Sequence, residues 1–184
     1  YIISFLLILP IVSAAWQIHS SWDLAGGQRL PQEIDTNATA TAAGDVWVTD
    51  YLSQAVYHYR PDGTLVENFS TTSFGVNRPT GLYVNSTTIA GGSFYVYDYE
   101  NNRIYLVNES GDNQSSFAAS PGSNAFIRGM ATNGSSNANP EFWVINDASN
   151  SLRRLNSAGG IVSSCSVGSF STYAFGLTTN STPG

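Results

Sequence analysis

The chain carries the same short segment three times, and each copy begins 48 residues after the one before. Aromatic and aliphatic side chains fill each copy, an Asp or Asn closes it, and a glycine follows at one fixed distance. A period of about 40–50 residues in a strand-rich chain is typical of stacked or radially arranged units. The copies are Asp45–Asp50, Ser93–Asp98 and Glu141–Asn146, and the glycines are Gly63, Gly111 and Gly159.

Each unit has the pattern of four short strands. Apolar and aromatic runs alternate with clusters of Gly, Asn, Asp and Ser, which are turn formers. Four antiparallel strands per unit, repeated in tandem, predict an all-β chain of β-propeller blades. We expect the aromatic residue within each copy (Trp47, Tyr95 and Trp143) to pack between blades. In the second unit the strands are expected at Gly81–Val84, Ser93–Asp98, Arg103–Val107 and Asn113–Ala119.

The second unit resembles an NHL repeat. The matching residues are Pro79-Thr-Gly81-Leu-Tyr-Val, Tyr95-Val-Tyr-Asp98, Asn102-Arg103-Ile104 and Ser110-Gly111. The first unit keeps the closing Asp, whereas the third has Asn146 in its place. The resemblance covers residues 29–184 and implies a propeller of four-stranded blades. It does not imply one activity, because propellers of this type bind proteins, RNA or small molecules, or catalyse reactions.

The predicted organisation divides the chain at residue 15. Residues 1–15 are uncharged and apolar, and they are similar to the core of a secretory signal. A cleaved signal, a retained strand that pairs with a neighbouring subunit, and an anchor are the three alternatives. Residues 16–184 are expected to hold an outer strand at Ser20–Leu24, three full blades, and the inner strand of a fourth at Tyr173–Thr179. Because a closed propeller needs at least four blades, we expect further sequence or another chain to complete the ring.

The surface is expected to be polar but poorly charged. Charged residues make up 11% of the chain, against about 25% in typical soluble domains, and the net charge is −6. That balance argues against nucleic acid as a partner, since phosphates need a basic patch. The single cysteine, Cys165, forms no disulfide framework and aligns with Phe117 of the preceding unit. We expect it to be a small buried side chain, and the alternative is a bridge to another chain or to further sequence.

Seven Asn-x-Ser/Thr sequons predict N-linked glycans and an extracellular or cell-surface location. Four of them occupy the same place in successive units, directly after the first strand, and two flank the turn between the third and fourth strands. Both kinds of turn lie on one face of a propeller, so six sequons are expected on that face. The first four are Asn37, Asn85, Asn133 and Asn180, the two at the later turn are Asn108 and Asn113, and the seventh is Asn68.

The opposite face is a candidate ligand face. Asp and Asn residues that follow each second strand could bind a ligand above the central channel, beside a sugar-stacking pair formed by Tyr51 and Tyr99. The alternative is that each Asp or Asn caps its own turn by accepting hydrogen bonds from backbone N–H groups. The candidate residues are Asp50, Tyr51, Arg78, Asp98, Tyr99, Arg128 and Asn146.

The sequence favours a non-enzymatic role. No nucleophile elbow and no zinc-ligand spacing occurs, and His58 is expected on a strand surface. We therefore expect no metal, and no cofactor beyond N-linked glycans. The prediction is a scaffold that assembles with itself or with other surface glycoproteins into a coat or fibre, and that touches a membrane only through residues 1–15. The alternatives are a secreted enzyme similar to propeller lactonases or amidating lyases, with a metal above the channel, and the ligand-binding ectodomain of a membrane protein.

Overall fold

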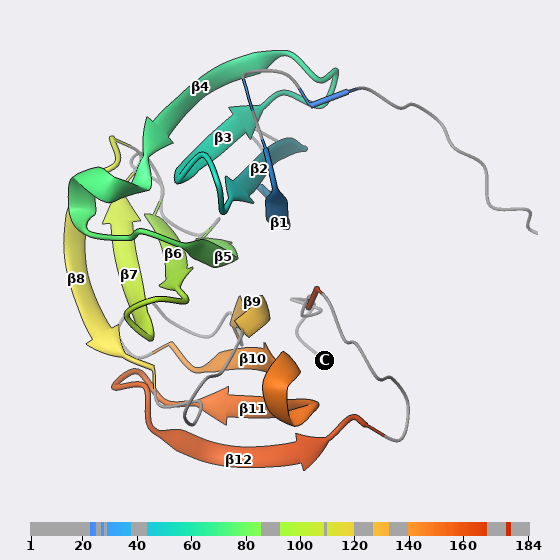
Figure 1. The fold of residues 1–184 in the computed structure, drawn as a ribbon, viewed down its shortest axis with the longest axis vertical. Helices are drawn as coiled ribbons and strands as arrows, with labels where there is room; N and C mark the ends of the chain where they lie inside the picture. Colours follow the sequence, from blue (N-terminus) through green and yellow to red (C-terminus); the bar gives the residue numbers. More distant parts are fainter. Residues whose placement is uncertain are drawn as a thin grey trace, which may run out of the picture.

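The computed structural model describes residues 23–24, 27, 29–37, 44–85, 93–108, 110–119, 127–132, 140–168 and 176–177. Within these ranges, twelve strands form three separate four-stranded antiparallel sheets. The sheets stand one after another around an arc, each with its first strand innermost and its fourth strand outermost (Figure 1). The prediction of an all-β chain with four-stranded antiparallel units is confirmed.

The strands of each sheet follow the chain order from the inside outward. In the second sheet, the predicted bounds agree with the observed strands to within two residues at every end. The first sheet contains β1 (Pro31–Asn37), β2 (Asp45–Asp50), β3 (Ala55–Tyr59) and β4 (Leu65–Ser70). The second contains β5 (Pro79–Asn85), β6 (Ser93–Asp98), β7 (Arg103–Asn108) and β8 (Asn113–Ala118). The third contains β9 (Ile127–Thr132), β10 (Phe142–Asn146), β11 (Ser151–Leu155) and β12 (Ile161–Ser166). Two short 3-10 turns complete the described elements: η1 (Thr71–Phe74) follows β4, and η2 (Asp147–Ser149) follows β10.

The recurring glycines lie in the tight turns between the third and fourth strands. Gly63, Gly111 and Gly159 have φ values of 85°, 81° and 81°, a region that side chains other than glycine rarely adopt. Two of these turns also pack closely against the preceding sheet. A Cβ atom at Gly111 would lie 3.3 Å from the Phe69 ring, and one at Gly159 would overlap the carbonyl oxygen of Ala118. Backbone conformation and close packing therefore both require glycine there.

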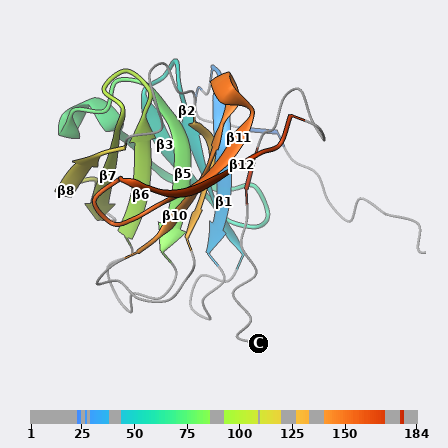
Figure 2. The same cartoon turned by 90° about the horizontal axis from the view of Figure 1, so that it is seen from below.

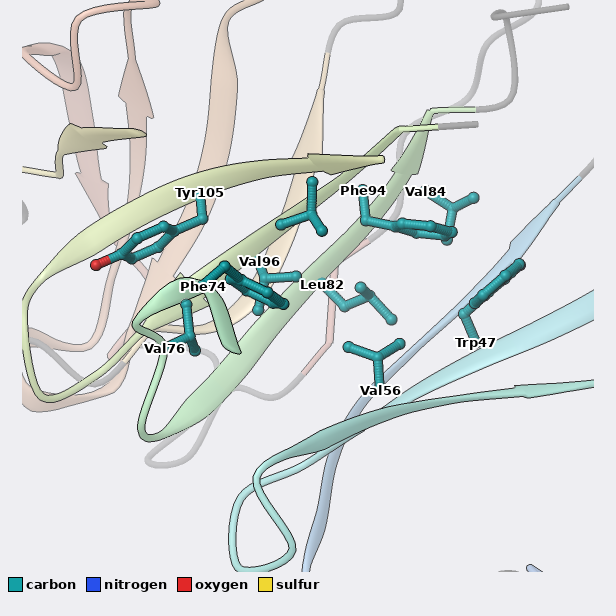
Figure 3. Packing of buried hydrophobic residues seen from close by; sticks show 10 residues of the cluster. Trp47, Val56, Phe74, Val76, Leu82, Val84, Phe94, Val96 and Tyr105 are labelled. Carbon is teal, nitrogen blue, oxygen red and sulfur yellow. The ribbon is translucent and has the colours of Figure 1, made fainter. Parts of the chain in front are cut away.

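The first and second sheets pack face to face through apolar side chains. The Trp47 ring lies 4.3 Å from the Phe94 ring, and Val56 and Leu82 are fully buried beside them (Figure 3). Burying an aliphatic side chain of this size contributes about 1.5–3 kcal/mol. The prediction that Trp47 packs between units is confirmed.

The second and third sheets pack in the same way. The Tyr95 ring meets the Phe142 ring edge-on at 4.9 Å, and Ile104 and Leu155 are fully buried in the same cluster. This arrangement confirms the prediction for Tyr95. Trp143, the corresponding residue of the third sheet, is only half-buried.

The prediction that Cys165 is buried is wrong, because its side chain is exposed. The corresponding outer-strand residues, Phe69 and Phe117, are partly buried because each packs against the sheet that follows. Among the described residues, no sheet follows β12, so the same strand position is open in the third sheet.

His58 lies in the expected strand, β3, but not on an open surface. Its side chain is 13% exposed, its ring stacks on Trp47 at 3.7 Å, and its Nε2 atom lies 2.8 Å from a carboxylate oxygen of Asp45. The prediction of surface exposure is therefore wrong, because the ring fills space beside the packed indole.

Several predictions concern residues outside the described ranges. These include the whole of residues 1–15 and most of Tyr173–Thr179. Of the expected outer strand at Ser20–Leu24, only Asp23 and Leu24 are described, and neither is in a strand. In the described part of the chain, no helix is long and apolar enough to span a membrane.

Candidate functional site

Four sequons lie at the same end of the sheets, which we call the sequon end. In the second sheet, Asn85 pairs with Ser93, which in turn pairs with Asn108, and Asn113 begins the neighbouring strand. Asn37 ends β1 at the corresponding edge of the first sheet. Figure 2 shows the sheets from the side, so that their two ends can be compared.

The remaining sequons are placed differently. Asn68 lies within β4 and is exposed, paired across the strands with Tyr57. Asn133 and Asn180 lie outside the described residues. At the sequon end, Asn113 is exposed, and the Asn108 side chain accepts a hydrogen bond of 2.8 Å from the backbone N–H of Asp112.

The opposite end of the sheets carries the candidate ligand-face residues. Asp50 is fully buried there, and its two carboxylate oxygens accept four backbone hydrogen bonds. One oxygen accepts from Arg29 and Leu30 at 2.6 and 2.7 Å, and the other from Leu52 and Ser53 at 3.0 and 2.7 Å. Asp50 therefore ties the turn after β2 to the segment that enters β1.

The hydrogen bonds also lower the pKa of the Asp50 carboxyl. Burial acts to raise the pKa of this carboxyl, but the backbone N–H groups of Ser53, Leu30 and Arg29 outweigh burial and lower the pKa below its usual value. Asp50 is therefore ionised at neutral pH. Its contribution to stability is present above about pH 4 and is lost as the pH falls through the lowered pKa.

Asp98 and Asn146 repeat this arrangement in the second and third sheets. Asp98 accepts hydrogen bonds from the backbone of Arg78 at 3.2 Å and Glu100 at 3.0 Å, and Asn146 accepts one from the backbone of Ser149 at 3.1 Å. Both side chains are almost completely buried. The geometry at all three positions is that of a turn cap, because the polar atoms face backbone N–H groups.

A hollow of about 280 Å³ opens beside these caps. It is lined by Leu30, Gln32, Tyr51 and Arg128, so the first and third sheets both contribute to it. Because Gln32 and Arg128 belong to the innermost strands, we call this hollow the channel mouth. Two of the predicted residues, Tyr51 and Arg128, meet there.

Arg128 connects the two sheets across the channel mouth. Its Nε atom donates to Asp147 at 2.9 Å, and its guanidinium also donates to the side-chain oxygen of Gln32 at 3.4 Å. Asp147 lies in the third sheet's 3-10 turn, so the Arg128–Asp147 ion pair fixes the guanidinium at the rim.

Arg78 extends the same surface. Its guanidinium carbon lies 5.5 Å from the centre of the Tyr51 ring, which is a cation–π distance, and its Nε atom is 4.0 Å from Glu100. Tyr99, in contrast, packs against the cluster between the second and third sheets. The channel mouth therefore has one aromatic ring and one guanidinium group in its lining, and a second guanidinium group lies beside the ring.

Gln32 was not identified from the sequence, although a signal for it exists. It is the extra residue of a β-bulge in β1, and Thr80 and Arg128 are the extra residues at the same place in β5 and β9. Bulges redirect side chains and are frequent next to binding sites. Thr80 is the middle residue of the Pro79-Thr-Gly81 pattern, and Gln32 and Arg128 occupy the aligned positions of the other two units. The middle residue of this pattern therefore predicts which residue the bulge in each innermost strand sets apart.

Glu33 is a buried acid that sequence reasoning also missed. In the first sheet, Glu33 pairs with Thr49 across the strands. At the equivalent position of the second sheet, Gly81 pairs with Tyr97. A Cβ atom at Gly81 would lie 3.1 Å from the Cβ atom of Tyr97 and 3.5 Å from Ile127, so the second sheet has a closely packed glycine where the first sheet has Glu33. Only 7% of Glu33 is exposed, and no described group bonds its Oε2 atom.

Burial makes Glu33 a neutral side chain at neutral pH. Desolvation first, and the negative charge of Asp35 second, raise the pKa of Glu33 to about 9. Asp35 itself accepts a hydrogen bond of 2.7 Å from the backbone N–H of Val84, which joins β1 to β5. Within the described ranges, no group of three or more His, Cys, Asp or Glu side chains could hold a metal ion.

No protein-family model matches the chain, and no curated protein matches it either. Among solved structures, virginiamycin B lyase from Staphylococcus aureus is similar with a TM-score of 0.52 and 16% sequence identity, over 79% of this chain and 44% of the lyase chain. BBS1N, solved in complex with ARL6DN, is similar with a TM-score of 0.51 and 14% identity, over 78% of this chain and 43% of its own. The chain thus spans less than half the length of either neighbour.

These likenesses concern the fold. Both neighbours are propeller proteins, and the three sheets of this chain correspond to propeller blades. The chain is therefore a β-propeller protein in which the described residues form three blades and no closed ring. The lyase's activity does not transfer to this chain, because a likeness at 16% identity extends to the fold alone.

Proposed function

We propose that the chain belongs to an extracellular, N-glycosylated propeller that serves as an interaction scaffold. The observation that carries this proposal is the separation of two surfaces at opposite ends of the blades. Four sequons lie at the sequon end, whereas Tyr51 and Arg128 line the channel mouth and Arg78 lies beside Tyr51.

Glycans at the sequon end direct partners to the other end. Each glycan is a bulky, hydrophilic group, and several on one face exclude most protein contacts. The low charge of the chain, 11% charged residues, suits a cell-surface coat or extracellular fibre. N-linked glycans are the only added groups in this proposal.

The channel mouth provides the contact surface. Tyr and Arg are enriched at the energetic centres of protein interfaces, because each combines a large contact area with directional polar groups. Tyr51 is half-buried and flanked by Arg78, whose side chain is 46% exposed. The partner in this proposal is another copy of the chain or a different surface glycoprotein.

Site-specific photo-crosslinking in a glycosylating, secreting host tests this role. A photoreactive phenylalanine analogue at position 51 is expected to form adducts with a second copy or with a surface glycoprotein. The matched control carries the same analogue at Asp112, an exposed residue at the sequon end, and is expected to form few adducts. Adducts mainly from position 112 would show that the partner binds at the wrong end for this proposal.

A further inference from the structure

The outermost strand of each blade has an open edge. The three outermost strands, β4, β8 and β12, lie along the outer perimeter of the arc (Figure 1). Within the described ranges, each pairs with one neighbour only, the third strand of its own sheet. The outward backbone N–H and C=O groups of such a strand can pair with a strand of another chain, and natural edges are usually protected by charges, prolines or covering groups.

Two of the three edges carry such protection. β4 contains Glu67 and, next to it, the exposed sequon residue Asn68. β8 begins with the exposed sequon residue Asn113. A glycan on either strand is a bulky group beside the edge, so this step rests on the proposed glycosylation of the chain. We therefore expect both edges to be obstructed for a second strand.

The edge of β12 has no protection of this kind. Its six residues are all exposed, and none of them is charged, a proline or part of a sequon. Strand register puts Ser164 at the place of Asn68, because Asn68 pairs with Tyr57 in the first blade and Ser164 pairs with Arg153 in the third. Among the three described outer strands, β12 is thus the unprotected one.

The backbone groups of β12 that point outward follow from its pairing with β11. The N–H of Val167 donates to the carbonyl of Asn150 at 2.8 Å, so residue 167 directs its backbone inward. Hydrogen-bonding direction alternates along an antiparallel strand, so Cys165 also faces inward, whereas Ser164 and Ser166 present their N–H and C=O groups outward. The bulge of this strand precedes Ser164, which leaves a regular hydrogen-bonding edge.

We propose that β12 pairs antiparallel with β12 of a second copy, which joins two blades into one continuous sheet. A two-fold axis brings identical residues together, so any charge on the strand would meet a like charge. The chain has no charged residue from Leu155 to Gly184, and β12 lies within this stretch. With the axis at Ser164, the outward groups of Ser164 bond those of its counterpart in the second copy.

The pairing is expected to be weak and separate from the channel mouth. Two six-residue strands bury less surface than the roughly 1,200–2,000 Å² of stable interfaces, so the dimer forms only as the protein concentration rises. The contact lies on the perimeter, and the channel mouth lies among the innermost strands. A copy that is paired through β12 can therefore still bind a partner at the mouth.

A glycan placed on β12 tests this inference on the natural full-length protein. In a glycosylating host, Ser164→Asn creates a sequon, because Ser166 supplies the hydroxyl two residues on. Sedimentation velocity is expected to show that the natural protein dimerises, and that protein glycosylated at position 164 needs at least about tenfold higher concentration to do so. The matched control, Ser164→Asn with Ser166→Ala, lacks the sequon and is expected to dimerise like the natural protein.

Cysteine cross-linking tests the register without any glycan. In a Cys165→Ser background, Ser164→Cys puts two thiols opposite each other across the axis. The Cα atoms of a hydrogen-bonded pair lie about 5.5 Å apart, within the range of about 4.4–6.8 Å that a disulfide spans. A glutathione redox buffer is expected to give a covalent dimer of this variant and little dimer of Gln114→Cys, an exposed β8 position, in the same background.

Three results would overturn the inference. These are a natural protein that remains monomeric at every concentration, unchanged dimerisation of protein glycosylated at position 164, and equal cross-linking from positions 114 and 164. Failure of the proposed function has a different signature. Unmodified Asn68 and Asn113 together with efficient cross-linking from position 164 would contradict the proposed glycosylation and support the pairing of β12.

Discussion

The Glu33→Gln variant is expected to be more stable than the natural chain by about 3 kcal/mol at pH 7. The pKa of Glu33 is about 9 in the folded chain and 4.5 when unperturbed, so the folded chain retains a proton that the unfolded chain releases between these values. Stability therefore falls by about 1.4 kcal/mol per pH unit above pH 4.5, and a glutamine does not incur this loss. Urea unfolding at pH 4 and pH 7 measures the difference, which vanishes at pH 4.

A surface acid provides the control for this experiment. Glu100 has a side chain that is 48% exposed and lies 4.0 Å from Arg78, and exposed pairs of this kind contribute about 0–1 kcal/mol. The Glu100→Gln variant is expected to show little change at either pH. If Glu33→Gln were less stable at pH 7, Glu33 would have to be ionised and paired, contrary to its burial beside Asp35.

Replacing Phe142 by alanine is expected to cost about 3–5 kcal/mol of stability. The ring is fully buried between Tyr95 at 4.9 Å and Phe117 at 5.4 Å, so its removal leaves a cavity between the second and third blades. The surrounding cluster contains side chains from several strands of both blades, and hydrogen-bonded strands resist moving inward to fill the cavity. Denaturant unfolding of both proteins at one pH gives the difference.

Val162 is the matched control for Phe142. It belongs to the same blade but lies on β12 and is 44% exposed, so Val162→Ala is expected to change stability by less than about 0.5 kcal/mol. A loss below about 1 kcal/mol for Phe142→Ala would mean that the second and third blades do not share a packed core. Such a result would contradict the arrangement of the blades.

Local patterns in the sequence predict the strands well. Alternating aromatic and aliphatic residues locate β6 to the residue, and the positive-φ glycine after the third strand locates the turn into the fourth. The alternation belongs to a single strand, and the positive φ of the turn requires glycine whatever packs against it, so a single unit contains the information. The predicted packing of Trp47 and Tyr95 succeeded for a related reason, since both project from the same strand position of consecutive units.

Predictions that depend on neighbouring units were less successful. Cys165 aligns with Phe117, but its burial requires a following blade that the described residues do not include. Glu33 is buried opposite Thr49 in β2, and both its burial and this pairing depend on strand register and on the neighbouring sheet. No local pattern in β1 contains this information.

Hydrogen bonding, and not residue type, shows what Asp50 and Asp98 contact. Asp50 and Asp98 have the composition of either a ligand site or a turn cap, and the sequence left both readings open. The structure directs their oxygens at backbone N–H groups and brings Tyr51 and Arg128 together at the channel mouth.

Glycopeptide mass spectrometry of the native protein tests the central claim most directly. The account predicts N-linked glycans at the sequon end, on Asn37, Asn85, Asn108 and Asn113, and an unmodified channel mouth. Unmodified asparagine at all four positions would contradict an extracellular scaffold whose glycans direct partners to the opposite face.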